Sequence, residues 1–168
     1  MSRHLILQRH AKSDWPVGVA DLERPLSTRG VRDAPAAARW VEANCPPVDV
    51  IIVSPARRTQ QTYDLIIAEW GRQATTIVDQ RVYEASVTDL IDVVHDISDD
   101  IGTAMIIGHN PGLELLAAQW PQTADRSASD RLATKFPTSA VAMISMSGSW
   151  ADPRARHLEQ VVVPRGAI

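Results

Sequence analysis

The chain has 168 residues, 45% of them hydrophobic and 22% charged, with a formal net charge of −3 and a single cysteine, Cys45. This length suits one domain over residues 1–168, and the small net charge argues against a general nucleic-acid binder or a binder of acidic membranes. A lone cysteine excludes an internal disulfide, and without a leader pattern or a stretch of about 18 apolar residues we expect a cytoplasmic protein.

The first predicted element is a short strand at the start of the chain. Leu5, Ile6 and Leu7 form an apolar run without polar alternation, which is typical of a strand covered on both faces. Arg9 and His10 follow this run. Ligands of α/β sheets bind beyond the carboxyl ends of the strands, so we expect both side chains to project into such a crevice.

Residues 12–28 form a long irregular stretch, and loops of this length are often functional. Ser27 or Thr28 is a candidate helix cap. The following helix is predicted from the spacing of its apolar residues, which are Val31, Ala34, Ala38 and Val41. Pro35 predicts a broken or late-starting helix, because a proline past the first turn removes a hydrogen bond and clashes with the preceding turn.

The middle of the chain predicts further strands that alternate with helices. Residues 48–53 are expected to form a buried strand, with Ser54 as N-cap and Pro55 as first residue of a helix that ends at Gly71. Residues 75–78 are a third short strand, before a loop and a helical pattern. Residues 104–107 are a fourth strand, and Asn110 with Pro111 is expected to begin another helix in the same way.

The last part of the chain predicts an antiparallel hairpin. Residues 121–138 are polar and are expected to be mostly loop, whereas residues 140–144 and 157–163 have the pattern of two strands at the sheet edge. Of the tryptophans, Trp15 and Trp150 are the candidates for exposure. The order of elements predicts an α/β fold, a three-layer αβα sandwich with a mostly parallel central sheet and an antiparallel edge.

Three predicted strand ends carry groups suited to an anion. The first has Arg9 and His10, the second has Ser54 with Arg57 and Arg58, and the fourth has His109. Helix N-termini add free backbone N–H groups, and arginine matches phosphate oxygens with paired donors. The sequence therefore predicts a phosphate site in which the histidines remain free to react.

The motifs resemble a known family. Residues 7–11 match its Arg-His-Gly signature with Ala11 in place of glycine, and residues 54–62 fit its Ser-x-x-x-Arg-x-x-Gln-Thr pattern. Residues 21–27 with Gly30 look like its second block, residues 108–111 are similar to its Gly-His segment, and residues 135–138 and 163–165 extend the likeness. The chain resembles the histidine phosphatase superfamily and, within it, the small phosphohistidine phosphatases of the SixA type.

The resemblance implies a phosphoglycerate-mutase-like fold and a phosphatase that needs neither cofactor nor metal. His10 would be the nucleophile that takes the phosphoryl group, and Arg9, Arg58 and His109 would bind its oxygens. The family spacing selects Arg58 over its neighbour Arg57. A histidine intermediate suits this chemistry, because it splits hydrolysis into two easier steps.

The general acid and the substrate stay open at this point. Glu84, in the loop after the third strand, is the candidate acid for an ester leaving group, and Asp21 is the reserve. A phosphoramidate depends less on such an acid. Without an insertion large enough to cover the site, the preferred substrate is phosphohistidine in a protein, and a small phosphorylated metabolite is the alternative.

Rival functions come from other classes. A non-catalytic phosphate-binding sensor would not demand an unpaired nucleophilic imidazole beside the arginines. A metallohydrolase on His10, His109 and Asp21 lacks any His-x-His or Glu-x-x-His cluster. The expected partners are therefore a phosphorylated protein or a small phosphoester, with no nucleic acid and no membrane.

Overall fold

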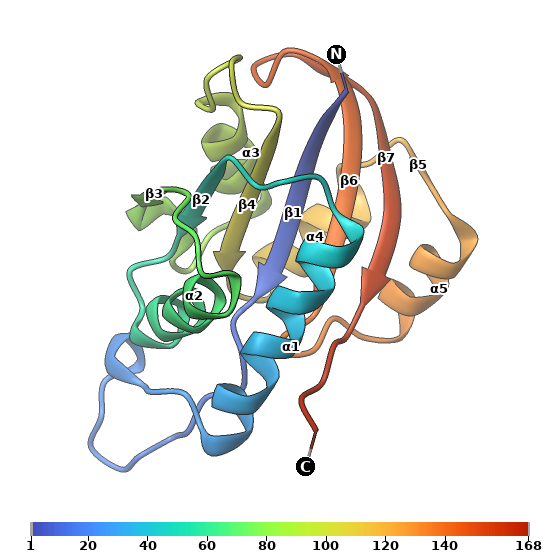
Figure 1. Ribbon diagram of the computed structural model, residues 1–168. Coiled ribbons are helices and arrows are strands. Elements are labelled where there is room, and N and C mark those ends of the chain that lie inside the picture. Colours follow the sequence, from blue (N-terminus) through green and yellow to red (C-terminus); the bar gives the residue numbers. More distant parts are fainter. Residues whose placement is uncertain (1, 168) are drawn as a thin grey trace.

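A computed structural model describes residues 2–167 as a seven-stranded mixed sheet in the order β3-β2-β4-β1-β6-β7-β5 (Figure 1). The strands are β1 Arg3–Arg9, β2 Val50–Val53, β3 Thr75–Val78, β4 Thr103–Gly108, β5 Thr123–Ala124, β6 Val141–Gly148 and β7 Pro153–Val162. Strands β3, β2, β4 and β1 run parallel, β6 is antiparallel to β1, and β7 is antiparallel to β6. The predicted mostly parallel sheet with an antiparallel side is confirmed.

Helices cover both faces of the sheet. α1 Thr28–Asn44 and α2 Arg57–Trp70 pack on one face, and α3 Val87–His95, α4 Gly112–Gln119 and α5 Arg126–Thr134 pack on the other. Two short 3-10 helices, η1 Asp21–Glu23 and η2 Gln80–Val82, lie in the connections. The three-layer αβα sandwich expected from the order of elements is therefore correct.

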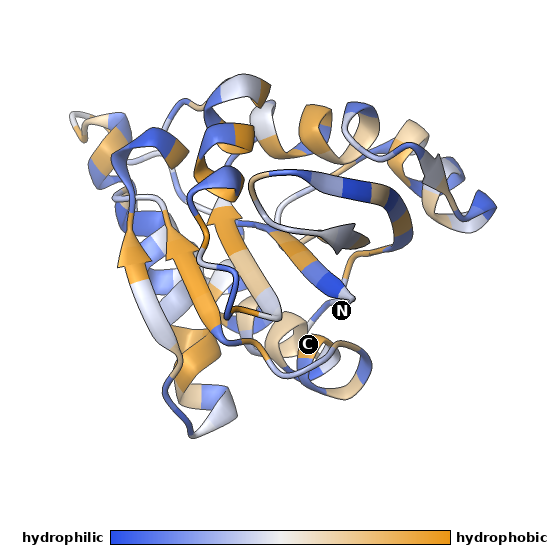
Figure 2. Ribbon diagram, turned by 90° about the horizontal axis from the view of Figure 1, so that it is seen from above, coloured by the Kyte–Doolittle hydropathy of each residue, from blue (hydrophilic) through white to orange (hydrophobic). Residues whose placement is uncertain are grey.

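The core lies on both faces of the central strands. Leu5 and Leu7 join the cluster under α3 and α4, whereas Ile6 joins the cluster under α1 and α2, and all three are fully buried. Seen from above, the central strands carry the hydrophobic colour (Figure 2). Each such side chain contributes about 2 kcal/mol by leaving water, which explains why this run specifies the middle of the sheet.

The prediction of a broken or late-starting first helix is wrong. α1 is continuous through Pro35, with Ser27 as its N-cap accepting from the Gly30 amide. The proline ring deprives the Val31 carbonyl of its helical donor, and Val31 is 49% exposed, on the side of the helix where water can replace that donor. The same exposure removes Val31 from the predicted buried face.

Two predicted helix caps are also wrong. α2 begins at Arg57 after Ala56, and α4 begins at Gly112 after Pro111. The Ser54 hydroxyl instead contacts His109, and the Asn110 amide donates to Glu114 and to the Phe136 carbonyl. Ser54 also accepts from the amide of Ala56, the residue before α2, but neither side chain caps an amide within its helix, and each has a distant partner, His109 or Phe136.

The polar stretch after α4 is not mostly loop. It contains β5 and the nine-residue helix α5, which buries Ala128 and Leu132 four positions apart on one narrow stripe. Because β5 pairs with β7, the hairpin of β6 and β7 is not the outermost part of the sheet.

Trp150 is fully buried, contrary to the expectation that it is exposed. Its buried indole N–H is satisfied, because it donates to the Ile101 carbonyl. In the described part of the chain no helix has the length and apolar character needed to cross a bilayer.

Candidate active site

The carboxyl ends of β1, β2 and β4 meet at one edge of the sheet, because β4 lies between the other two strands. They open into a cleft of about 640 Å³. The cleft brings together every residue that the sequence selected for the site: Arg9, His10, Asp21, Arg58, Glu84 and His109. Arg57 is exposed and does not line the cleft, whereas Arg58 is buried in its wall.

His10 is held in one tautomer. Its Nδ1 lies 2.7 Å from the Ala11 carbonyl oxygen, which only accepts, so Nδ1 carries the proton and donates. Burial, with a smaller contribution from His109 and Arg58, outweighs the Ala11 hydrogen bond and lowers the pKa of His10 to about 3. The ring is therefore neutral at pH 7, with its lone pair on Nε2.

His109 is held in the opposite tautomer. Its Nδ1 accepts from the Arg58 Nη2 at 3.2 Å, so its Nε2 carries the proton and donates to the Ser54 hydroxyl at 2.7 Å. Burial and then Arg58 lower the pKa of His109 to about 3. The two histidine rings lie 5.3 Å apart between centroids, so both face the same small volume.

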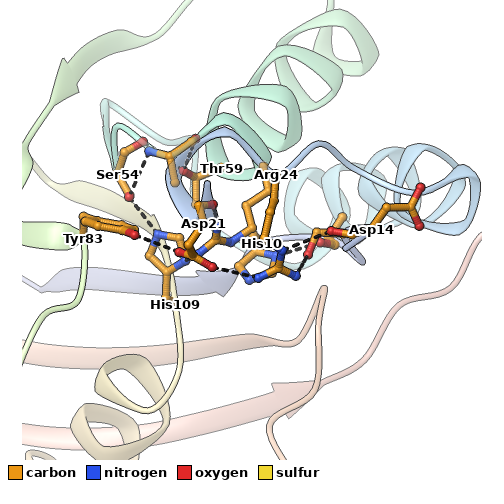
Figure 3. Close-up of polar contacts among 12 residues, drawn as sticks. His10, Asp14, Asp21, Arg24, Ser54, Thr59, Tyr83 and His109 are labelled. Atoms are coloured by element: carbon orange, nitrogen blue, oxygen red, sulfur yellow. Dashed lines mark hydrogen bonds and ion pairs between the residues drawn. The ribbon is translucent and has the colours of Figure 1, made fainter. Parts of the chain in front are cut away.

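Asp21 connects the first long loop to Arg58, and Figure 3 shows it together with Tyr83 and Arg24. Its carboxylate accepts from Arg58 at 3.0 Å, from Arg24 at 2.9 Å and from the Tyr83 hydroxyl at 2.7 Å, and its carbonyl accepts from Arg58 at 2.6 Å. Burial raises the pKa of this carboxyl, but the hydrogen bonds from Tyr83, Arg24 and Arg58 outweigh it and hold the pKa well below its usual range. Asp21 therefore stays ionised and has no proton to give to a leaving group.

A turn over residues 136–140 supports the end of β1 from the other side. The Phe136 carbonyl accepts from Arg9 at 3.1 Å and from the Asn110 amide at 2.8 Å. The Ser139 amide donates to the His10 carbonyl at 3.1 Å. These bonds fix Arg9 and the backbone of His10 relative to each other.

Two small residues hold the first loop close to β1. A Cβ at Gly30 would lie 2.1 Å from the Lys12 carbonyl oxygen, so only glycine lets the first turn of α1 approach the end of β1. The Ala11 side chain is fully buried against Leu26 and Ala34. This packing explains why a methyl group fits where the family signature has glycine.

Glu84 lines the cleft from the connection between β3 and α3. It has a φ of 53°, in the left-handed region that a side chain other than glycine rarely adopts. Three residues of the first long loop, Lys12, Ser13 and Trp15, also line the cleft, and Ser13 is buried.

Sequence reasoning missed Tyr83 and Arg24 as parts of the site. Tyr83 donates to Asp21 and packs edge-on against His109, with ring centroids 5.6 Å apart. The only feature of the sequence that pointed to Tyr83 was its position next to Glu84. Arg24 was noted as part of a family block without a role, although it donates to Ser13 at 2.6 Å as well as to Asp21.

The cleft combines free cationic donors with an unprotonated ring nitrogen. The Nε atoms of Arg9 and Arg58 are buried without a hydrogen-bond partner in the described residues. Buried donors of this kind match an anionic ligand, and the neutral His10 ring offers a nucleophile beside it. Within residues 2–167 no three His, Cys, Asp or Glu side chains are grouped to hold a metal ion.

Comparison with known proteins assigns the chain to a family. The model of the histidine phosphatase superfamily (branch 1) matches residues 5–106. The uncharacterized protein Rv1276c of Mycobacterium tuberculosis is 37% identical over 161 residues, which cover 94% of this chain and 99% of that protein.

Solved structures share the whole architecture. The candidate phosphohistidine phosphatase SixA of Nakamurella multipartitia superposes with a TM-score of 0.85 at 31% identity, covering 98% of this chain and 97% of its own. The protein histidine phosphatase SixA complexed with tungstate superposes with a TM-score of 0.78 at 18% identity, covering 96% of this chain and 97% of its own. At that identity the second likeness concerns the fold alone.

Proposed function

Because this chain belongs to the histidine phosphatase superfamily (branch 1), we propose that it hydrolyses phosphohistidine in a protein, with His10 as the phosphoryl acceptor. Membership and the SixA-like structure support a phosphatase of the histidine type. The residue roles and the substrate are the proposal. The observation that carries them is the His10 tautomer, since the Ala11 carbonyl holds the proton on Nδ1 and leaves Nε2 free to attack.

In the first step the Nε2 lone pair of His10 attacks phosphorus, while the bond from phosphorus to the leaving nitrogen breaks. Arg9 and Arg58 bind the phosphoryl oxygens, because charge on these oxygens must be stabilised throughout transfer. The leaving imidazole departs neutral, since its other ring nitrogen already carries a proton. No protein acid is needed for this leaving group.

In the second step water attacks the phosphorus of phosphorylated His10. The P–N bond breaks, its electron pair returns to Nε2, and both protons of the water leave with the product as dihydrogen phosphate. Nδ1 keeps its proton on the Ala11 carbonyl throughout, so the ring returns to its starting tautomer. The first step exchanges one P–N bond for another, and the hydrolysis therefore supplies the driving force.

The open form of the cleft favours a protein substrate over a small metabolite. Only residues 79–86 connect β3 to α3, and only residues 109–111 connect β4 to α4, so these connections are too short to fold over the site. Sites for small molecules bury about 70–90% of their ligand. A phosphorylated side chain on a protein surface can enter an open cleft without being enclosed.

The test is to trap the phosphoenzyme. The protein is incubated with phosphohistidine whose phosphoryl group is labelled, quenched in alkali, and assayed for bound label and for released phosphate, with chelator present. We expect alkali-stable, acid-labile label and phosphate release from the wild type, and neither from His10→Ala with an unchanged circular dichroism spectrum. Wild-type turnover by His10→Ala would refute the mechanism, and loss of activity with chelator would refute its metal independence.

A second candidate function rests on Glu84. This acidic residue lines the cleft and has a backbone in the left-handed region, where strain often marks functional sites, and a carboxyl at this place suits protonation of an oxygen leaving group. The alternative is therefore hydrolysis of a small phosphomonoester. Faster turnover of such an ester than of phosphohistidine would favour this alternative, and phosphate binding without any turnover would favour a sensor.

A further inference from the structure

The first long loop exposes an unusual run of apolar side chains. Trp15 is 74% exposed and Val17 is fully exposed, and Val19 and Leu22 are also exposed. No charged residue interrupts residues 15–20. In Figure 1 the loop projects from the molecule beyond the carboxyl end of β1. We call residues 15–22 the apolar loop. Contiguous exposed apolar groups of this kind mark interaction sites.

The apolar loop is held in place at its base. Ser13 pairs with Leu26, and the Asp14 amide donates to the Pro25 carbonyl at 3.0 Å. The Arg24 guanidinium stacks 3.2 Å from the centre of the Trp15 ring and donates to the Asp14 carbonyl at 3.0 Å. A stacked tryptophan has already lost much of its rotational freedom, so burying it against a partner costs less entropy.

The apolar loop reaches beyond the cleft. Trp15 lines the cleft, but Val17, Val19 and Leu22 are not among its lining residues. A ligand confined to the cleft therefore does not touch these three side chains. An occupant that contacts them while it presents a phosphoryl group to His10 must be larger than the cleft.

We propose that the apolar loop is the docking surface for the protein that carries the phosphohistidine. This inference rests on the proposed function. The partner is a folded domain with an apolar patch beside its phosphorylated side chain, because the loop offers it apolar contacts next to the phosphate-binding residues. A single loop is much smaller than the roughly 800 Å² that each partner buries in a stable complex, so the encounter is transient.

The charge of the loop argues against a lipid surface. Between residues 13 and 23 the charged residues are Asp14, Asp21 and Glu23, without Lys or Arg, and the Arg24 that stacks on Trp15 already donates to Asp21 and to the Asp14 carbonyl. Surfaces that bind membranes combine apolar side chains with basic ones, which attract anionic lipid. Residues 13–23 offer no basic side chain to an anionic headgroup, so their apolar side chains suit an apolar patch on a protein.

The test compares hydrolysis of the same P–N bond in a free amino acid and in a folded protein. The substrates are free phosphohistidine and a histidine-phosphotransfer domain phosphorylated on its histidine with phosphoramidate. Both contain the same P–N linkage, so the ratio of their kcat/KM values reports the contribution of the protein surface. The variant is Val17→Ser with Val19→Ser, because neither side chain lines the cleft. The control is Ile77→Ser, which removes an exposed apolar side chain from β3.

We expect the wild type and the control to prefer the protein substrate, and the double variant to lose about tenfold of that preference with no change on free phosphohistidine. An unchanged preference in the double variant, or none in the wild type, overturns the docking surface and leaves the proposed function intact. Failure of the wild type on both substrates refutes the proposed function itself.

Two further outcomes would also overturn the proposal. Sedimentation with phosphatidylserine–phosphatidylcholine vesicles that the double variant abolishes would assign the loop to a membrane. A dimer in analytical ultracentrifugation that the double variant dissociates would assign it to a second copy of this chain.

Discussion

Replacing Arg165 by methionine tests how the end of the chain holds the active site. Its guanidinium donates to Asp33 at 3.2 Å and to the Thr138 carbonyl at 2.8 Å. Asp33 lies in α1, and its side chain is only 1% exposed. Thr138 belongs to the turn whose Ser139 amide donates to the His10 carbonyl. Arg165 therefore links a buried carboxylate to the turn that supports His10.

The expected loss of free energy of unfolding follows from the partners that the Asp33 carboxylate loses and from those that it keeps. Breaking one side of a buried ion pair costs about 3–5 kcal/mol. Asp33 keeps the Arg29 guanidinium at 3.3 Å and the Gly166 amide at 3.0 Å, and the Arg165 side chain is 34% exposed. We therefore expect Arg165→Met to lower the free energy of unfolding by about 2 kcal/mol, which lowers the Tm by about 4–8 °C.

The assay is urea unfolding followed by fluorescence of the five tryptophans, together with thermal unfolding. The control is Arg154→Met, whose ion pair with Asp152 is exposed on both sides, and we expect it to leave stability near wild type. In a double-mutant cycle, Asp33→Asn should reduce the cost of Arg165→Met. A change below about 0.5 kcal/mol for Arg165→Met would refute the argument, since it is typical of a surface substitution.

Three further predictions concern the cleft. Asp21→Asn should lower kcat/KM about tenfold, because Arg58 and Tyr83 lose a charged acceptor, and wild-type kinetics would contradict this. Because the folded pKa of His109 lies near 3, the unfolded chain binds the proton first as the pH falls below about 6.5, and stability falls with it. His109→Gln should remove about 2 kcal/mol of this loss between pH 7 and pH 5, measured by urea unfolding at both values, and an unchanged loss would refute it. Glu84→Gln should slow phosphomonoesters much more than phosphoramidates, and equal losses would remove its role as an acid.

The fold could be predicted from patterns of apolar and polar residues that lie close together in the sequence. The unbroken apolar run at Leu5, Ile6 and Leu7 predicted a strand buried on both faces, because side chains alternate between the faces of a sheet whatever lies around it. The family spacing from Ser54 selected Arg58, and this arginine lies in the cleft. Local patterns therefore carried the order of the layers, and the resemblance to a family carried the choice of Arg58.

Some local rules failed where a distant partner decided the outcome. The polar helix α5 was missed because Ala128 and Leu132 are too few to produce a periodic signal, although the sheet gives them a surface to pack on. The caps assigned to Ser54 and Asn110 were wrong because each side chain hydrogen-bonds a residue far away in the sequence, His109 or Phe136. These contacts depend on how separate segments meet in space, and helix propensity, which is a local property, carries no information about that.

The sequence by itself determined the central strands and the residues that follow them at the end of the sheet, Arg9, His10 and His109, because a buried strand is a local pattern of apolar residues. Only the tertiary structure decided their chemical states. Tyr83 and Asp21 stand 62 positions apart, and Arg58 and His109 stand 51 apart, yet each pair shares a hydrogen bond. Such bonds set the tautomer of a ring and the charge of a carboxyl, because these depend on distance in space and on burial.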